Sequence, residues 1–219
     1  MCGKDRRSAD NMKIESFSVL NGIALHYLNN LMSGLYGMAQ LAQMTRKEDH
    51  LEEAVDVTVK NIKKAKNLTA MMARYTEALK NDTGETDLVS ILDAVLVLLE
   101  HDFEKCGIKV EKAMPEDNGH WTVAARSGDL AEMSFRIIHN SLRSMSENGG
   151  KLCVALENNN GEICIKVSDT GSSVRDQKAE DSPLTDFEVA RRMAAANNGS
   201  FSVTGNSDGG ASVTISFRN

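Results

Sequence analysis

The chain has 219 residues, 26% of them charged and 41% hydrophobic, and its formal net charge is −6. This composition excludes a disordered chain and leaves room for one large domain or two small ones. A mildly acidic chain without a basic patch is a poor partner for nucleic acid, because that binding depends on neutralising phosphates. There is neither an apolar run of about 18–20 residues, as a membrane helix needs, nor a signal peptide, so we expect a cytoplasmic protein.

Two segments in the N-terminal half show the apolar spacing of long amphipathic helices. The first runs from residue 17 to 44 and the second from about 51 to 79, and the short charged stretch between them predicts an antiparallel hairpin. A lone hairpin cannot bury both apolar stripes, and their near-heptad spacing favours a second copy that completes a four-helix bundle. We therefore expect a homodimer. The residues expected to face inward on the second helix are Val55, Ile62, Leu68, Met72 and Tyr75.

The C-terminal half mixes helical and strand patterns, which predicts an α+β sandwich. We expect helices at 88–105 (capped by Asp87), 128–145 (capped by Ser127) and about 185–196. Strands are expected at 108–114 and 121–125, and antiparallel hairpins at 152–156 with 163–167 and at 201–204 with 211–217. The chain thus divides into a flexible N-terminus (1–15), a helical hairpin (16–80), a linker (81–86) and the α+β domain (87–219).

The first helix carries a candidate catalytic pair, His26 and Asn30, which lie four residues apart and so share one helix face. His26 falls beside the apolar stripe rather than within it. An exposed imidazole is partly neutral at cellular pH and can attack phosphorus, and a carboxamide one turn away can bind a phosphoryl oxygen or an attacking water. The plain alternative is a polar helix surface that happens to hold a histidine.

The stretch from His26 to Leu41 resembles the phosphoacceptor helix of sensor histidine kinases. In that family a His, an acid, an apolar residue and Asn-Asn precede a small-residue run and Gly-x-Ala-Gln-Leu. The second helix resembles its hairpin partner, and segments 87–108, 129–150 and 168–171 are similar to the start of the ATP-binding domain, its Asn motif and its first glycine motif. The resemblance covers residues 17–217 and implies a dimeric helical hairpin followed by a Bergerat-type nucleotide-binding sandwich.

The resemblance also implies roles for single residues. His26 matches the phosphoacceptor. Asn140 matches the second Asn of the Asn motif, which faces the triphosphate and its Mg²⁺. Asp169 matches the acid that accepts the adenine amino group, and Gly171 the glycine that allows close backbone approach. These three residues are the expected remnant of an ATP site, and Asn140 is the candidate metal ligand if ATP binds.

Several departures weaken that ATP site. The acid after the phosphoacceptor is Tyr27, a poor general base near neutral pH, and Arg136 stands at the first Asn position, where it cannot bind a metal. The segment expected to hold the phosphate-binding glycine loop, 182–187, contains no glycine and carries Asp186, whose charge would repel a triphosphate. The lid segment, 172–181, is short and highly charged.

From these residues we expect a phosphorelay protein of two-component signalling, a histidine phosphotransferase with a degenerate, pseudokinase-like ATP domain. His26 would become phosphohistidine and pass the group between receiver-domain aspartates, with Mg²⁺ supplied by the receiver. Two alternatives stay open: a divergent but active ATP-dependent histidine kinase, and a non-catalytic dimeric adaptor that binds a kinase or receiver. ATP would be a cofactor only under the kinase interpretation.

Overall fold

The computed structural model describes residues 2–80, 84–115, 121–159, 161–171, 186–206 and 209–218, without the side chains of residues 2–20 and 79. The chain divides into two compact units, Met1–Arg74 and Tyr75–Asn219. Across the described residues, no helix is both long enough and apolar enough to span a lipid bilayer.

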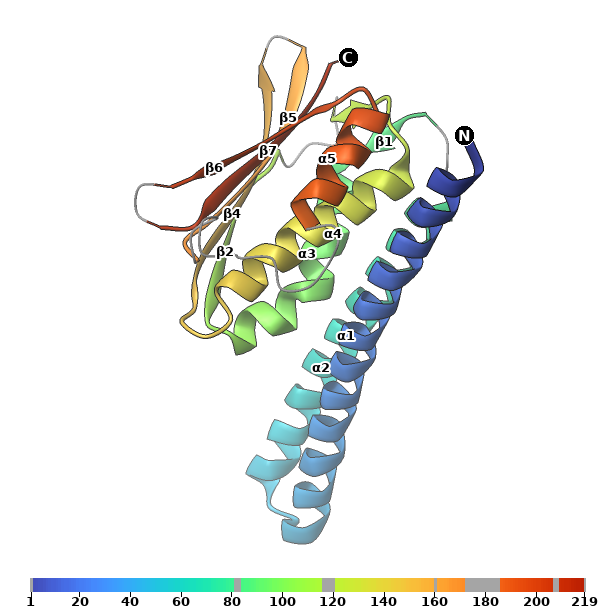
Figure 1. Ribbon diagram of the computed structural model, residues 1–219. Coiled ribbons are helices and arrows are strands. Elements are labelled where there is room, and N and C mark those ends of the chain that lie inside the picture. The colour runs from blue at the N-terminus through green and yellow to red at the C-terminus, as the bar shows by residue number, and fades with distance from the viewer. Residues whose placement is uncertain are drawn as a thin grey trace. The chain divides into compact units, whose positions relative to one another are not determined.

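The first unit is built from two long helices, α1 (Cys2–Thr45) and α2 (Glu48–Lys80). The last residues of α2, from Tyr75 on, belong to the second unit. Only two residues connect α1 to α2, so the two helices run antiparallel and side by side (Figure 1). The helix α1 begins at Cys2, whereas the sequence pattern suggested a flexible segment up to residue 15. Among the described side chains of α1, from residue 21 on, the buried ones are Ala24, Tyr27, Leu31 and Ala42.

The inward face expected for α2 is partly wrong. Leu68 and Tyr75 are buried, each with 1% of the residue exposed, and Met72 is half-buried. Val55 and Ile62, however, are 61% and 56% exposed. A single hairpin covers only one narrow stripe of each helix, and these two residues lie on a different one. Other large apolar residues left exposed among the described side chains of the two helices are Leu25, Met32, Tyr36, Leu41, Met44, Leu51 and Val59.

The second unit is an α+β sandwich, as expected. Its strands are β1 (Thr86–Asp87), β2 (Ile108–Ala113), β3 (Thr122–Val123), β4 (Gly150–Asn159), β5 (Glu162–Asp169), β6 (Ser200–Gly205) and β7 (Ala211–Arg218). Its own helices are α3 (Leu88–Lys105), α4 (Ser127–Ser144) and α5 (Asp186–Ala196). The strands β2-β4-β5-β7-β6 form one sheet in that order, β1 pairs with β3, and the three helices lie over one face of the larger sheet (Figure 1).

The core of this unit lies between that sheet face and the helices. Alternate residues of the central strands point into it, so that Val154 stands opposite Val167, and Val167 opposite Val213. From the helix side α3 contributes an almost continuous apolar run, and α4 packs against both α3 and α5. Ten of the eighteen residues of α3 are buried, and the polar residues Ser90, Asp93, Glu100 and Glu104 recur along one narrow face that is left half-buried or exposed.

Three local features of this unit differ from the sequence prediction or refine it. Asp87 caps α3 as expected, because its carboxylate accepts a hydrogen bond from the amide of Val89 at 3.0 Å. Ser127 does not cap α4: the cap position is Arg126, and the Ser127 hydroxyl instead lies 2.7 Å from that of Thr86. The sheet is also not wholly antiparallel, because β2 pairs with β4 in parallel. A parallel pair needs a crossover, and α4 supplies it.

Candidate functional site

His26 lies on α1 with its residue exposed. Each residue of an α-helix turns the side chain by about 100°. The buried Ala24 and Tyr27 therefore define one face of α1, and the exposed apolar Leu25 and Met32 a second. His26 falls on a third face, away from both, and Asn30 lies one turn further along that face, also exposed. Both predicted residues of the pair are thus placed where a partner protein can reach them.

The hairpin fixes α1 at the level of this face. One turn beyond His26, the carbonyl of Leu31 accepts a hydrogen bond from the side-chain amide of Asn61 on α2, at 3.2 Å. A Cβ on Gly34 would lie 3.4 Å from the same amide nitrogen, an ordinary van der Waals distance, so Asn61 packs beside this glycine. Burial of Tyr27 and Leu31 fastens the same stretch of helix. The side chains around His26 are therefore held by a packed and hydrogen-bonded segment.

The other predicted residues gather in the second unit, where β5 ends beside α4. Asp169, 4% exposed, is the last residue of β5. Its Oδ1 accepts hydrogen bonds from the backbone amides of Gly171 at 3.0 Å and Ala211 at 3.3 Å. Its Oδ2 accepts one from the hydroxyl of Ser141 on α4, at 2.7 Å. The carboxylate is thus bonded on both oxygens by groups of the chain itself.

Gly171 is held close to the end of α4. A Cβ on Gly171 would collide with the hydroxyl of Ser144, so only glycine fits there without a shift. Asn140 lies on α4 immediately before Ser141 and is half-buried. The structure therefore brings Asp169 and Gly171 into direct contact and places Asn140 next to Ser141, which binds Asp169.

One turn before Asn140, Arg136 forms a buried ion-pair cluster. Its Nε lies 2.6 Å from Glu132 Oε1, and its Nη1 lies 2.7 Å from Asp186 Oδ1 at the start of α5. The side chains of Arg136 and Glu132 are 12% and 0% exposed. Burial disfavours the charge of the guanidinium, but the carboxylates of Glu132 and Asp186 more than offset this and raise the pKa of Arg136. Arg136 therefore stays a cation, and its charge is used inside the protein.

Two aromatic contacts surround this cluster. Phe135 stacks on His139 with ring centroids 5.3 Å apart, and Tyr75 meets Phe135 edge to face. Burial, followed by the charge of Asp186, shapes the titration of His139: burial lowers its pKa and outweighs the carboxylate. His139 is therefore a packing residue.

This region also contains three residues that the sequence did not predict, Glu132, Ser141 and Ser144. Only Glu132 gave a signal, because it precedes Arg136 by four residues and that spacing favours an ion pair on one helix face. The contacts of Ser141 and Ser144 join α4 to a segment about 30 residues away and have no local pattern. The lid segment 172–181 and the loop residues 182–185 lie outside the described residues.

Comparison with solved structures places the fold among histidine kinase catalytic domains. The catalytic domain of histidine kinase ThkA matches with a TM-score of 0.53 and 14% identity, over 61% of this chain and 93% of that one. The mycobacterial sensor histidine kinase MprB matches with a TM-score of 0.51 and 15% identity, over 62% of this chain and 97% of that one. No protein-family model and no curated protein matches the sequence. The predicted histidine-kinase-like fold is confirmed; similarity at this identity shows the fold alone.

Proposed function

We propose that the chain is a phosphorelay protein of two-component signalling that transfers a phosphoryl group through His26. The observation that carries the proposal is the position of His26 on a face of α1 separate from the hairpin core and from the exposed apolar stripe. On that face an imidazole can meet a partner's phosphorylated side chain. Asn30, one turn along, is in place to bind a phosphoryl oxygen.

The reaction is a reversible displacement at phosphorus. A neutral nitrogen of His26 attacks the phosphorus of a receiver's aspartyl-phosphate, the bond from phosphorus to the aspartyl oxygen breaks, and the free carboxylate leaves. The second receiver's aspartate then attacks the phosphohistidine, and the imidazole leaves. Mg²⁺ held by the receiver's acidic pocket neutralises charge on the phosphoryl oxygens. The packed helix around Tyr27 and Leu31 keeps the attacking nitrogen oriented for an in-line approach.

A homodimer belongs to the same proposal. The exposed apolar residues of α1 and α2, among them Met32, Tyr36, Val55 and Ile62, form stripes that a second hairpin could cover as a four-helix bundle. Because His26 lies outside these stripes, its face would remain open in such a bundle. Each dimer would then present two phosphoacceptor histidines.

An ATP-dependent histidine kinase is the second candidate, and the kinase-like fold of the second unit favours it. In that function Asn140, Asp169 and Gly171 would bind the nucleotide, with Asn140 as a Mg²⁺ ligand. Two observations disfavour this function: the carboxylate of Asp169 is hydrogen-bonded within the chain, and Arg136 is paired with Asp186. We therefore place phosphotransfer between receivers first.

The test compares the wild-type chain with His26→Gln and with His50→Gln, a matched change at a histidine of α2. Each is mixed, without nucleotide, with a receiver domain phosphorylated on its aspartate, and acid-labile, base-stable phosphate on the chain is measured. We expect labelling of the wild type and of His50→Gln and none of His26→Gln. Full labelling of His26→Gln would disprove the proposal. Label from γ-labelled ATP that depends on His26 would establish the kinase in its place.

A further inference from the structure

Two groups of contacts occupy the region where the resemblance places a nucleotide. One group surrounds Asp169, at the position matched to adenine recognition. The other surrounds Arg136, at the position matched to the first Asn facing the triphosphate. Both lie wholly within the second unit, and both are made by described side chains.

At the first position, every oxygen of the carboxylate already has a donor. The hydroxyl of Ser141 lies 2.7 Å from Asp169 Oδ2, and the amides of Gly171 and Ala211 bond to Oδ1. Asp169 is 4% exposed, and three of the about four acceptor positions of its carboxylate are used by the chain itself. An incoming amino group would have to share Oδ2 with the Ser141 hydroxyl, so it adds little to a carboxylate that is already hydrogen-bonded.

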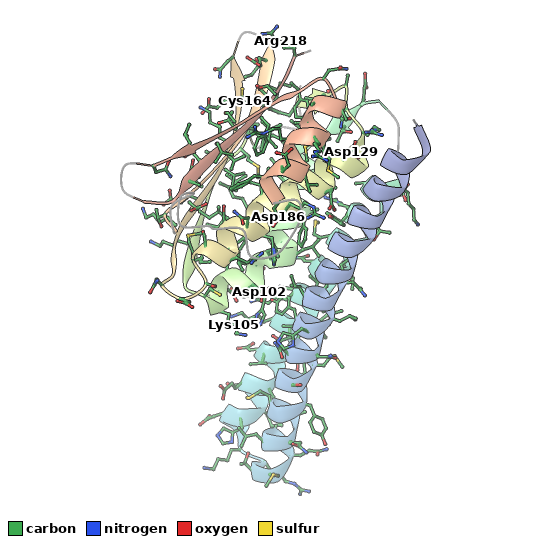
Figure 2. The ribbon with its side chains drawn as sticks, in the orientation of Figure 1. Asp102, Lys105, Asp129, Cys164, Asp186 and Arg218 are labelled. Atoms are coloured by element: carbon green, nitrogen blue, oxygen red, sulfur yellow. The ribbon has the colours of Figure 1, made fainter. Side chains whose placement is uncertain are left out.

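At the second position, the cationic side chain of Arg136 stands where a metal ligand would be needed, and its charge is already paired with carboxylates of the chain. Arg136 bonds Glu132 on its own helix and Asp186 at the start of α5. Figure 2 labels Asp186 where α5 begins. A phosphate that approached Arg136 would compete with two carboxylates held at hydrogen-bond distance. Asp186, 24% exposed at its side chain, would repel that phosphate as well. The residues present therefore do not fit a nucleotide with its metal.

We infer that the chain's own side chains close this region: the Ser141 hydroxyl occupies the adenine acceptor, and the Glu132–Arg136–Asp186 ion-pair cluster occupies the phosphate end and fastens α5 to α4. The first turn of α5 is thereby anchored without any ligand. In this arrangement the surface formed by α4 and α5 has one shape whether or not nucleotide is present. A partner that docks on it would be bound equally well in both conditions.

This inference rests on the proposed function and deepens its claim of independence from ATP. It concerns the second unit, whereas the proposed function acts through a histidine of the first unit, so the two can fail separately. Phosphotransfer to His26 without nucleotide is measured on the first unit's histidine. Closure of the second unit is measured by nucleotide binding and by the anchoring of α5. Nucleotide binding with intact transfer from a receiver would remove the closure alone, and absence of both transfer and binding would remove the proposed function alone.

The anchoring is tested with two matched variants in the first turn of α5, Asp186→Asn and Glu188→Gln. Each removes one negative charge, but Glu188 pairs with Arg192 on the surface, with side chains 41% and 63% exposed. Hydrogen exchange of the α5 amides is followed in the full-length chain. We expect Asp186→Asn to lower protection of the α5 amides by about tenfold or more, and Glu188→Gln to change it little. Equal effects of the two variants would overturn the anchoring.

The closure is tested by thermal unfolding of the wild type with and without millimolar MgATP or MgADP. We expect the nucleotides to shift Tm by less than about 1 °C. The same scan is run on Asp169→Asn, which keeps the size of the side chain. A nucleotide-dependent rise of several degrees in the wild type that Asp169→Asn abolishes would show an open site and overturn the proposal.

Discussion

The ring of Tyr75 meets the ring of Phe135 edge to face, with centroids 6.4 Å apart. Tyr75 lies on α2, is 1% exposed and is the first residue of the second unit. Its hydroxyl is buried and has no hydrogen-bond partner among the described residues. Burial, together with the nearby charge of Glu132, raises the pKa of Tyr75 well above its ordinary value, so the phenol stays neutral.

From this contact we predict opposite effects for two substitutions of Tyr75. Tyr75→Phe keeps the aromatic contact and removes a hydroxyl that is buried without a partner, so stability should stay equal or rise by up to about 1 kcal/mol. Tyr75→Ala removes the ring and leaves a cavity, which should cost about 3–5 kcal/mol. Chemical denaturation of both variants, followed by a spectroscopic signal from the second unit, measures the change in the free energy of unfolding. A Phe variant less stable than the wild type by more than about 1 kcal/mol would indicate a partner for the hydroxyl.

A second prediction concerns Asn197, which is 7% exposed and joins the end of α5 to the start of α4. Its Nδ2 donates to Asp129 Oδ2 at 2.9 Å, and its Oδ1 accepts from the amide of Arg126 at 2.9 Å. Asn197→Ala leaves both groups without this partner, and we expect a loss of about 2–3 kcal/mol. The neighbouring Asn198 is exposed and has a φ of 57°, so Asn198→Gly is the matched control and should be nearly neutral. Equal losses in the two variants, measured by urea unfolding, would refute this role.

The sequence predicted those parts of the fold that have a local pattern. The two long helices, α3 with its Asp87 cap and both β-hairpins were found because spacing and turn residues mark them. The parallel pairing of β2 with β4 was not predicted, because pairing between distant strands leaves no trace in either strand. The hydroxyl of Ser127 likewise bonds Thr86, 41 residues away, and this tertiary contact replaced the cap expected from its position.

The candidate site was predictable to a similar extent. Asp169 and Gly171 were found through a short motif, and the structure joins them by one hydrogen bond. The motif could not predict that Ser141 also binds Asp169, because the packing of α4 on β5 brings Ser141 there. The exposure of Val55 and Ile62 has a related cause: apolar spacing shows which residues share a stripe but not which stripe the hairpin itself covers.

A third prediction follows from the buried His139. Burial lowers its pKa, so between that value and the ordinary pKa of about 6.5 the unfolded chain binds more protons than the folded one. The stability that this residue contributes is therefore complete above about pH 7. It falls as the pH drops through about 6.5 toward the pKa of His139 in the folded chain, with a slope of at most about 1.4 kcal/mol per pH unit. The charged groups that act on the ring are Asp186, Arg143, Asp102 and Arg136.

The measurement compares the free energy of unfolding of the wild type and of His139→Gln from pH 7.5 to pH 5, values that bracket the ordinary pKa of about 6.5. We expect the variant to lose the part of the slope that belongs to His139, while the titrations of other groups remain. Identical slopes in the two proteins would show that His139 binds protons equally in the folded and unfolded chains.

The last prediction concerns the apolar stripe of α2, on which Val55 and Ile62 are 61% and 56% exposed. If a second copy covers this stripe, the double substitution Val55→Glu with Ile62→Glu buries two unpaired carboxylates in the bundle. Burial of such charges is costly, so the dimer should weaken by at least about 100-fold in Kd. The control is Lys60→Glu, which also changes the net charge by two negative units but lies nearly opposite the stripe on the helix. Sedimentation equilibrium measures both, and because the stripe is already exposed in the single chain, the Glu variant should still fold as a monomer. A dimer equally stable in all three proteins would mean that a different surface joins the two copies.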